Sequence, residues 1–333
     1  MLTGLASGCH SGDHADKLTE AHVPTTVKPL LQLQRTVPLP HVRGGFDLMA
    51  LDAAGQRLFV AAEDNHTVEV IDVRHGRPLA SLPGFNEPKW VVYRPEGNRL
   101  FVSTGGDGRV TELDGKTYQK VRSYAFREAC NNLRYDSLTR QLVVGVGKSF
   151  GALGLIDVAH NVKLGEIPLA GYAKQFELDG PLIYVNEPAL NQVEVIDRTT
   201  RKQTAVWPVT GATRNIPMAL DRVHHRLFVA CAPGQLVVFS TPDGRRVASL
   251  PIPGDADGIY YDARRARLYV SCGAGSIAVV QQQAPDRYQV LQLLPTVPGA
   301  GTSLYSAALD AYFLATPQAA GKAASLRFYR VPK

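Results

Sequence analysis

A sequence pattern that occurs seven times along the chain restricts the possible folds more than any other feature. Each copy holds a short apolar segment after a turn, and successive copies are roughly 40 residues apart. The segments occupy residues 57–60, 99–102, 141–144, 182–185, 226–229, 267–270 and 311–314. Repeats of this length that are built from strands match one propeller blade each. The sequence therefore predicts an all-β fold, a seven-bladed β-propeller with four-stranded antiparallel blades.

The first repeat shows how the four strands of a blade are encoded. Residues rich in β-branched and aromatic side chains, separated by turn residues, predict an inner strand at 47–52, a second at 58–62, a third at 68–72 and an outer strand at 78–82. The second and third strands are apolar almost throughout. Blades that stack on both faces require this pattern.

The ends of the chain predict how the ring closes. The last repeat ends after a third strand at 326–331 and lacks an outer strand, whereas residues 31–39 look like an outer strand placed before the first inner strand. We expect these two segments to pair, because the pairing removes an open sheet edge. This defines a single propeller domain at 29–333, preceded by an N-terminal tail at 1–28.

The repeats carry a resemblance to a known family. The form Asp-x-x-Gly-x-Arg-Leu-Phe-Val followed by Val-Glu-Val-Ile-Asp, in residues 52–72 and partly again in 182–197, resembles the YVTN-repeat (YncE-like) family of bacterial seven-bladed propellers. The resemblance covers roughly residues 31–331. It implies an exported protein, and because many members have no assigned activity, it says little about function.

The N-terminal tail contains a candidate lipidation site, Cys9. The preceding Ala6-Ser7-Gly8 resembles the end of a bacterial lipoprotein signal, but Leu5 lies four residues before the cysteine instead of three, and a basic start is missing. Two interpretations remain open: an incidental cysteine in a tail, or a lipidated Cys9 that tethers the protein to a membrane. We expect an extracytoplasmic location, in the periplasm or cell envelope, with or without this anchor.

Composition narrows the classes of partner. The net charge is +6, but no five consecutive residues are lysine or arginine and the basic residues are spread over every repeat, which argues against nucleic acid. The four cysteines show no metal-binding spacing. We therefore predict a monomer with no cofactor, no bound metal and no nucleic-acid partner.

The predicted ring places polar residues at the mouth of its central channel. Aligning the inner strands puts Asp47, Lys89, Asn131, Lys174, Ile216, Asp257 and Gly301 at one level, and the segments that cross between blades surround them. Loops held by a rigid scaffold are the usual place for a binding site. The candidate ligand-binding residues are His41, Arg43, Asp47, Glu87, Lys89, Arg127, Asn131, Tyr172, Lys174, Arg214 and Asp257.

Several functions fit this mouth. The preferred one is a binding or interaction platform for a small anionic or zwitterionic ligand or a protein partner. The alternative is a lactonase-like hydrolase or lyase, with His41 or Glu87 as the base and Lys89 or Arg127 stabilising an oxyanion. An enzyme should show a deep cleft and a perturbed pKa, whereas a platform should show shallow loops. A channel filled with water, whose charges only balance one another, also remains open.

Two further possibilities follow from other residues. Propeller enzymes that resemble gluconolactonase hold a divalent cation with oxygen ligands, a role that Asp47, Asn131 and Asp257 could imitate, but lysines at the same level would repel the metal. The second possibility is protein docking on the face opposite the channel mouth. It would require an exposed apolar patch beside the arginines that start the second strands. These are Arg57, Arg99, Arg226 and Arg267.

Overall fold

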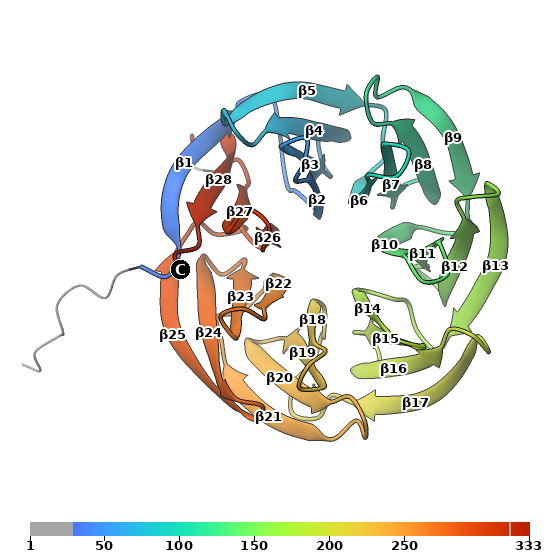
Figure 1. The fold of residues 1–333 in the computed structure, drawn as a ribbon, viewed down its shortest axis with the longest axis vertical. Helices are drawn as coiled ribbons and strands as arrows, with labels where there is room; N and C mark the ends of the chain where they lie inside the picture. Colours follow the sequence, from blue (N-terminus) through green and yellow to red (C-terminus); the bar gives the residue numbers. More distant parts are fainter. Residues whose placement is uncertain (1–28, 320) are drawn as a thin grey trace, which may run out of the picture.

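The computed structural model describes residues 29–319 and 321–333, in which 28 β-strands form seven four-stranded sheets. The sheets stand around a central axis as the blades of a propeller (Figure 1). All neighbouring strands within each sheet pair in antiparallel fashion. The predicted all-β, seven-bladed propeller is confirmed.

Each blade runs from an inner strand at the axis to an outer strand at the rim. The inner strands are β2 (Met49–Asp52), β6 (Pro88–Arg94), β10 (Cys130–Asp136), β14 (Phe176–Asp179), β18 (Met218–Asp221), β22 (Ala256–Asp262) and β26 (Ser303–Ser306). The second strands are β3 (Arg57–Ala62), β7 (Arg99–Thr104), β11 (Gln141–Val146), β15 (Leu182–Glu187), β19 (Arg226–Cys231), β23 (Arg267–Cys272) and β27 (Ala311–Thr316). We number the blades 1 to 7 in this order.

The remaining strands complete the blades. The third strands are β4 (Thr67–Asp72), β8 (Arg109–Asp114), β12 (Gly151–Asp157), β16 (Gln192–Asp197), β20 (Gln235–Ser240), β24 (Ser276–Ala284) and β28 (Ala324–Arg330). The outer strands are β5 (Arg77–Pro83), β9 (Lys120–Ala125), β13 (Val162–Leu169), β17 (Lys202–Pro208), β21 (Arg246–Pro251), β25 (Arg287–Pro295) and β1 (Gln32–Leu39). In the first blade the inner strand begins at Met49, two residues later than predicted, so Asp47 belongs to the crossing segment.

The ring closes by pairing the two ends of the propeller. β1 lies antiparallel to β28, with Gln32 opposite Arg330 and Leu39 opposite Ala324, and both lie in blade 7 (Figure 1). The inward side chains Val37 and Leu39 of β1 are buried. The predicted closure is therefore confirmed, and the burial of each such side chain stabilises it by about 1.5–3 kcal/mol.

The core is divided among the blade interfaces. Seven apolar clusters fill the seven gaps between adjacent blades, one in each, because the second and third strands expose apolar side chains on both faces. The cluster between blades 7 and 1 joins Leu39 of β1 and Phe313 of β27 to Leu58 and Val60 of β3. The ring therefore depends on every interface, including the one that the N-terminal strand completes.

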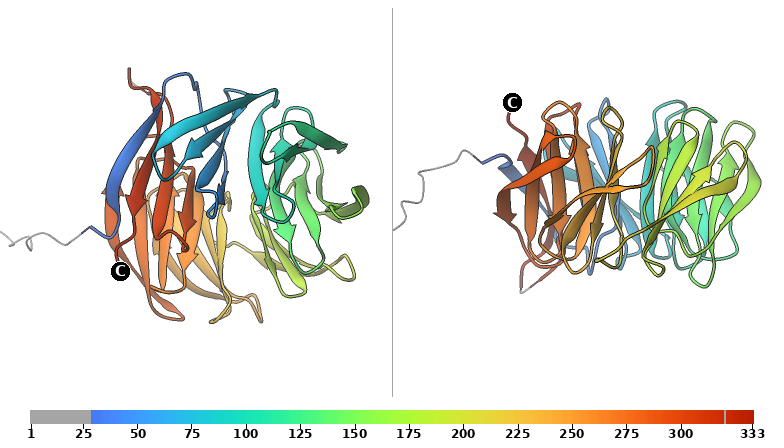
Figure 2. Two further views of the ribbon diagram at one scale, coloured as in Figure 1. Left: turned by 45° about the horizontal axis from the view of Figure 1, so that its top comes forward. Right: turned by 90° about the horizontal axis from the view of Figure 1, so that it is seen from below.

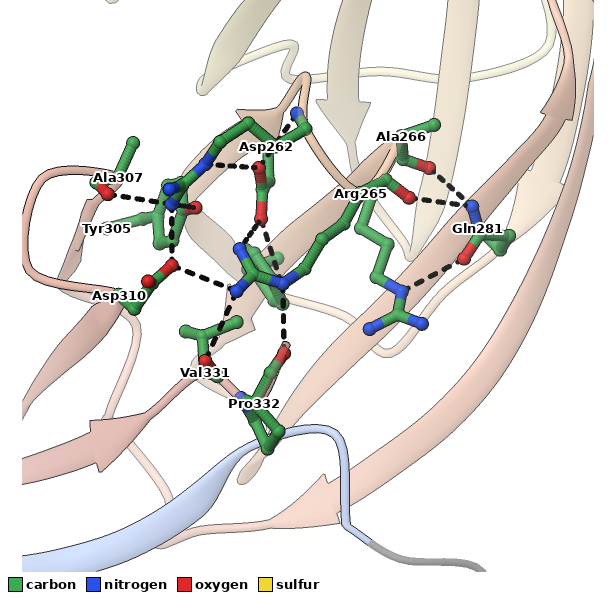
Figure 3. Close-up of polar contacts among 12 residues, drawn as sticks. Asp262, Arg265, Ala266, Gln281, Tyr305, Ala307, Asp310, Val331 and Pro332 are labelled. Atoms are coloured by element: carbon green, nitrogen blue, oxygen red, sulfur yellow. Dashed lines mark hydrogen bonds and ion pairs between the residues drawn. The ribbon is translucent and has the colours of Figure 1, made fainter.

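An arginine network fixes the end of blade 7 to blade 6. The Arg265 guanidinium donates to Asp262 at 2.8 Å, to Asp310 at 2.9 Å and to the Pro332 carbonyl at 2.9 Å (Figure 3). The side chain of Asp262 is 1% exposed and that of Arg265 11%. The ion pairs therefore lie largely out of water and hold the residues that follow β28.

Loops emerge on two opposite faces of the ring (Figure 2). We call the crossing face the one that carries the connections from each outer strand to the next inner strand, together with the loops between second and third strands. The turn face carries the turns between inner and second strands. Strand-ending aspartates cap the turns that follow them: Asp72 accepts from the His75 amide at 3.0 Å and Asp197 from the Thr200 amide at 2.7 Å.

Candidate functional site

Five of the predicted ligand-binding residues line one cavity at the end of the channel on the crossing face. This channel-mouth cavity has a volume of about 230 Å³. Its walls include one residue from each of five blades, because equivalent positions at the starts of the inner strands converge on the axis. They are Asp47, Lys89, Asn131, Lys174 and Asp257.

A second cavity opens beside the first and shares three of its residues. It has a volume of about 270 Å³ and is also lined by Lys89, Asn131 and Lys174. The predicted residues Glu87 and Tyr172 join its wall. The structure therefore brings together seven of the predicted residues around two adjoining cavities on one face.

The other four predicted residues lie outside the linings of both cavities. His41 Nε2 is 2.8 Å from the buried Glu69 carboxylate, and the Arg127 guanidinium lies 5.2 Å from the centroid of the Phe150 ring. These contacts direct His41 to strand β4 and Arg127 to the loop between β11 and β12. Arg43 and Arg214 also do not line either of the two cavities.

Lys89 is engaged by carboxylates of the crossing face. Its ammonium group forms an ion pair with Glu63 and lies 4.0 Å from Glu87 Oε2. The Lys89 side chain is 17% exposed. Burial lowers the pKa of Lys89, although the carboxylate of Asp47 opposes this effect.

The two aspartates of the cavity affect each other's ionisation. Burial and the nearby carboxylate of Asp257 raise the pKa of Asp47 to about 7, against the opposing charges of Lys89 and Lys174. Burial also raises the pKa of Asp257, and Lys174 is the main opposing charge. Near neutral pH, both the protonated and the ionised form of Asp47 are therefore populated.

Three charged groups of the cavity have no partner of opposite charge in direct contact. Among residues 29–319 and 321–333, no ion pair within 4.0 Å involves Asp47, Lys174 or Asp257. One hydrogen bond that Asp47 does accept comes from the Leu48 amide at 3.0 Å. A cationic and an anionic group remain available to a ligand in the same small volume.

Gln175 lies between the channel-mouth cavity and a second cavity further along the channel. Its side chain reaches from blade 4 past blade 5, where Oε1 accepts from the Met218 amide at 3.3 Å, and Nε2 donates to the Asp257 carbonyl of blade 6 at 3.0 Å. Gln175 is 5% exposed and lines cavities on both sides. A hydrogen-bonded amide therefore forms part of the wall of both cavities.

The donor set does not suit a resident metal ion. Asp47, Asn131 and Asp257 line one cavity, but so do Lys89 and Lys174, whose charges oppose a divalent cation. Within the described part of the chain, no group of three or more His, Cys, Asp or Glu residues is arranged to hold a metal. The arrangement favours an organic ligand over a metal-dependent reaction.

Two arginines of the turn face form ion pairs. Arg57 contacts Asp52 of its own blade at 2.7 Å, whereas Arg226 contacts Asp286 of the next blade at 2.7 Å. Val223, at 74% exposure, is an apolar side chain on a turn of this face. A single exposed apolar residue is normal on a protein surface and does not by itself make a docking patch.

One residue important for the cavity, Gln175, was not identified from the sequence; it directly follows Lys174. Glu63 also lines the cavity, and the repeat pattern places its loop, between a second and a third strand, on the crossing face. No sequence signal predicts that the side chain of Gln175 spans two blades.

The fold and site define a seven-bladed β-propeller with a cavity lined by charged residues at one mouth of its channel. No protein-family model matches the chain. The uncharacterized protein YncE of Salmonella typhi is 31% identical over 98 residues, which are 29% of this chain and 28% of that protein. The YncE protein of Salmonella typhimurium strain LT2 is 30% identical over 98 residues, with the same 29% and 28% coverage. The matched part is thus under a third of the length of these relatives.

Solved structures share the fold over most of the chain. A chain of the crystal structure of the mitotic checkpoint complex superimposes with a TM-score of 0.76 at 16% identity, covering 98% of this chain and 99% of that one. A chain of hydrazine synthase from Kuenenia stuttgartiensis gives a TM-score of 0.72 at 15% identity, covering 83% and 94%. At such low identity the likeness shows the propeller fold alone.

Proposed function

We propose that this protein is a binding propeller whose channel-mouth cavity takes a small zwitterion, such as an α-amino acid or a betaine. The observation that carries the proposal is the group of charges without direct partners, Asp47, Lys174 and Asp257, facing one volume of about 230 Å³. A ligand ammonium group would lie against the two carboxylates, and a ligand carboxylate against Lys174. Charge-assisted hydrogen bonds of this kind are the strong ones.

Calorimetric titration on matched variants tests the proposal. The probes are L-amino acids and glycine betaine, with succinate as an anion that lacks a cationic group. Asp257→Asn and Lys174→Met should each weaken binding of the zwitterion at least tenfold, because a hydrogen bond to a charged group is worth about 1.5–3 kcal/mol. Lys116→Met, an exposed lysine on a turn outside the cavity lining, is the control and should bind as the wild type does.

Two results would overturn the zwitterion site. One is the absence of saturable heat with every probe. The other is binding that persists unchanged in both cavity variants, which would place the ligand elsewhere. Preference for succinate over the zwitterions would instead show that the cavity selects anions, and would contradict the role given to Asp47 and Asp257.

A metal-independent hydrolase or lyase at the same cavity is a second candidate. The supporting observation is the pKa of Asp47, which burial and Asp257 raise to about 7, a value suited to a general base at neutral pH. Because His41 pairs with Glu69, Asp47 takes the place of His41 as the base in this alternative. A lactone substrate should then be turned over by the wild type and not by Asp47→Asn, and equal rates would exclude the role.

We also infer an extracytoplasmic, YVTN-like protein. The recurring motif in residues 52–72 and the partial similarity to YncE support this inference. Cys9 lies outside the described residues and remains the candidate lipid anchor. No helix in the described part of the chain is long and apolar enough to cross a membrane. Metabolic labelling with a radioactive fatty acid should mark the wild type and not Cys9→Ser if the anchor exists.

A further inference from the structure

A larger cavity lies on the other side of Gln175, toward the turn face. It has a volume of about 450 Å³, which falls in the range of small-molecule sites of about 300–1,000 Å³. All seven inner strands contribute to it, so it lies on the axis of the propeller. Its walls include Met49, Trp90, Arg134, Met218, Ile259 and Tyr305. We call it the turn-side cavity.

One guanidinium group inside this cavity is held in a fixed plane. The Arg134 guanidinium lies 4.0 Å from the centroid of the Trp90 ring and 5.9 Å from that of Phe176. Its Nη2 is 3.3 Å from Glu177 Oε1. Stacking on an aromatic face and pairing with a carboxylate both restrict the rotation of the side chain, so the group is organised before any ligand arrives.

Part of the hydrogen-bonding capacity of this guanidinium is unused. Besides Glu177, Arg134 donates only a 3.4 Å bond to the adjacent Leu133 carbonyl, and Nε has no acceptor among residues 29–319 and 321–333. A guanidinium carries five N–H donors in a fork that matches a carboxylate. The free edge of Arg134 therefore suits one carboxylate of a ligand.

The other walls of the cavity combine apolar and polar side chains, and Glu177, the partner of Arg134, is among them. Met49, Met218 and Ile259 supply aliphatic and thioether surface, and Tyr305 adds a ring. Arg222 also lines the cavity but is 57% exposed and lies 3.5 Å from Asp179, so Arg134 is the cation that an enclosed ligand would meet. This character differs from that of the channel-mouth cavity, where charged groups dominate.

We propose that the turn-side cavity is a second binding site, for a small monocarboxylate with an aromatic or aliphatic body. The carboxylate would accept hydrogen bonds from the free edge of Arg134. The body would pack against Met218 and Ile259, where burial of apolar surface favours binding. Gln175, which lines both cavities, lies between this site and the channel-mouth cavity.

The chain provides its own reporter for this site. It has two tryptophans, and Trp207 lies in the blade 4–5 interface against Tyr184 and Phe239. In the Trp207→Phe variant, the emission of Trp90 alone reports on the turn-side cavity. Titration with phenylacetate and with octanoate should change this emission saturably. The neutral amides phenylacetamide and octanamide, which match the acids in shape, should bind at least tenfold more weakly.

Substitutions of Arg134 in the Trp207→Phe background, followed by calorimetry, identify the cation. Arg134→Met should weaken binding of both acids at least tenfold, and Arg134→Lys should weaken it less, because it keeps the charge and loses the fork. Lys174→Met should leave these affinities unchanged, so that failure of this site and failure of the zwitterion site are told apart. Thermal melts confirm that each variant is folded.

Three outcomes would overturn the second site: no saturable emission change with either acid, amides that bind as tightly as the acids, or full affinity in Arg134→Met. If Arg134→Met does not fold, Arg134→Lys and the comparison of acid with amide still decide the question. Displacement of the acids by the zwitterionic ligand would contradict the separation of the two cavities by Gln175.

Discussion

Gln175 Nε2 donates a 3.0 Å hydrogen bond to the backbone carbonyl of Asp257, two blades further around the ring. The same side chain accepts from the Met218 amide at 3.3 Å. One amide therefore joins blades 4, 5 and 6 and lines two cavities of the channel.

Removing this amide should destabilise the ring and connect the cavities. Gln175→Ala leaves a buried amide N–H and a carbonyl without a side-chain partner, at a cost of about 1–3 kcal/mol. Thermal unfolding should therefore occur at lower temperature than in the wild type. The control is Gln283→Ala, an exposed glutamine that should have little effect. A melting temperature equal to that of the wild type would show that the hydrogen bonds of Gln175 carry no net stability.

The raised pKa of Asp47 predicts that the difference in melting temperature between the wild type and the Asp47→Asn variant depends on pH. Because burial and Asp257 raise this pKa to about 7 from an ordinary 3.8, the folded protein keeps a proton that the unfolded chain has lost. This aspartate therefore lowers stability as the pH rises from about 4 to 7. Asp47→Asn should melt at a higher temperature than the wild type at pH 8, by on the order of 2 °C, and the difference should shrink at pH 5. A difference that is constant with pH would contradict the raised pKa.

The same proton should control the zwitterion site. An ammonium group binds the ionised form of Asp47, so affinity should rise as the pH increases from 6 to 8 and binding should release a proton. Titrations at one pH in two buffers of different ionisation heat measure that release directly. In Asp47→Asn the buffer dependence should disappear, whereas its persistence would assign the proton to another group.

A pair of buried glutamates holds the crossing segment that carries Lys174. Glu194 accepts from the Ala170 amide at 3.1 Å, and Glu187 from the Gly171 amide at 2.6 Å. Burial and the hydrogen bond with Glu187 raise the pKa of Glu194 to about 7. The neutral form of Glu194 therefore persists to a higher pH than that of an ordinary glutamate.

Glu194→Gln tests this pair. The amide cannot ionise. As the pH rises from 5 to 8, the wild type loses stability because folding raises the pKa of Glu194, so the variant should gain stability relative to the wild type. Thermal melts over this range provide the measurement. Glu166→Gln, an exposed glutamate on β13, is the control and should show no pH-dependent difference. Loss of folding in Glu194→Gln at every pH would mean that the charge itself is required.

The arginine network at the end of blade 7 should be important for ring closure. Arg265→Met removes the partner of the buried Asp262 carboxylate and releases the Pro332 carbonyl, and breaking a buried ion pair costs about 3–5 kcal/mol. The variant should unfold at a markedly lower denaturant concentration. Arg245→Met, whose arginine is 70% exposed and 3.7 Å from Asp243, should change little. Equal effects of both substitutions would contradict a special role for Arg265.

The sequence predicts the scaffold well because each repeat encodes the same local structure. The apolar segments that end at Val60 and Val102 occupy β3 and β7, and the segment at 31–39 pairs with β28 as its pattern indicated. Equivalent positions in equivalent blades must lie at equivalent heights. This symmetry is why Lys89 and Lys174 were placed correctly in one cavity.

The sequence predicts the site less well where a side chain makes contacts that equivalent positions in the other repeats do not make. His41 turns to a buried glutamate of its own blade, and Arg127 to a phenylalanine, so neither lines the cavities. Gln175 and Arg134 owe their positions to partners on other strands and other blades. Such contacts depend on distances across the channel, which no pattern along the chain records.

The pairing of β1 with β28 also bears on synthesis and folding. The two strands are separated by nearly the whole propeller, so β1 leaves the ribosome long before its only sheet partner exists. Until then its polar backbone edge is open and able to join other chains. Completion of blade 7 is thus a late, all-or-none step, and a chain truncated before residue 324 is expected to aggregate rather than to persist as a shorter propeller.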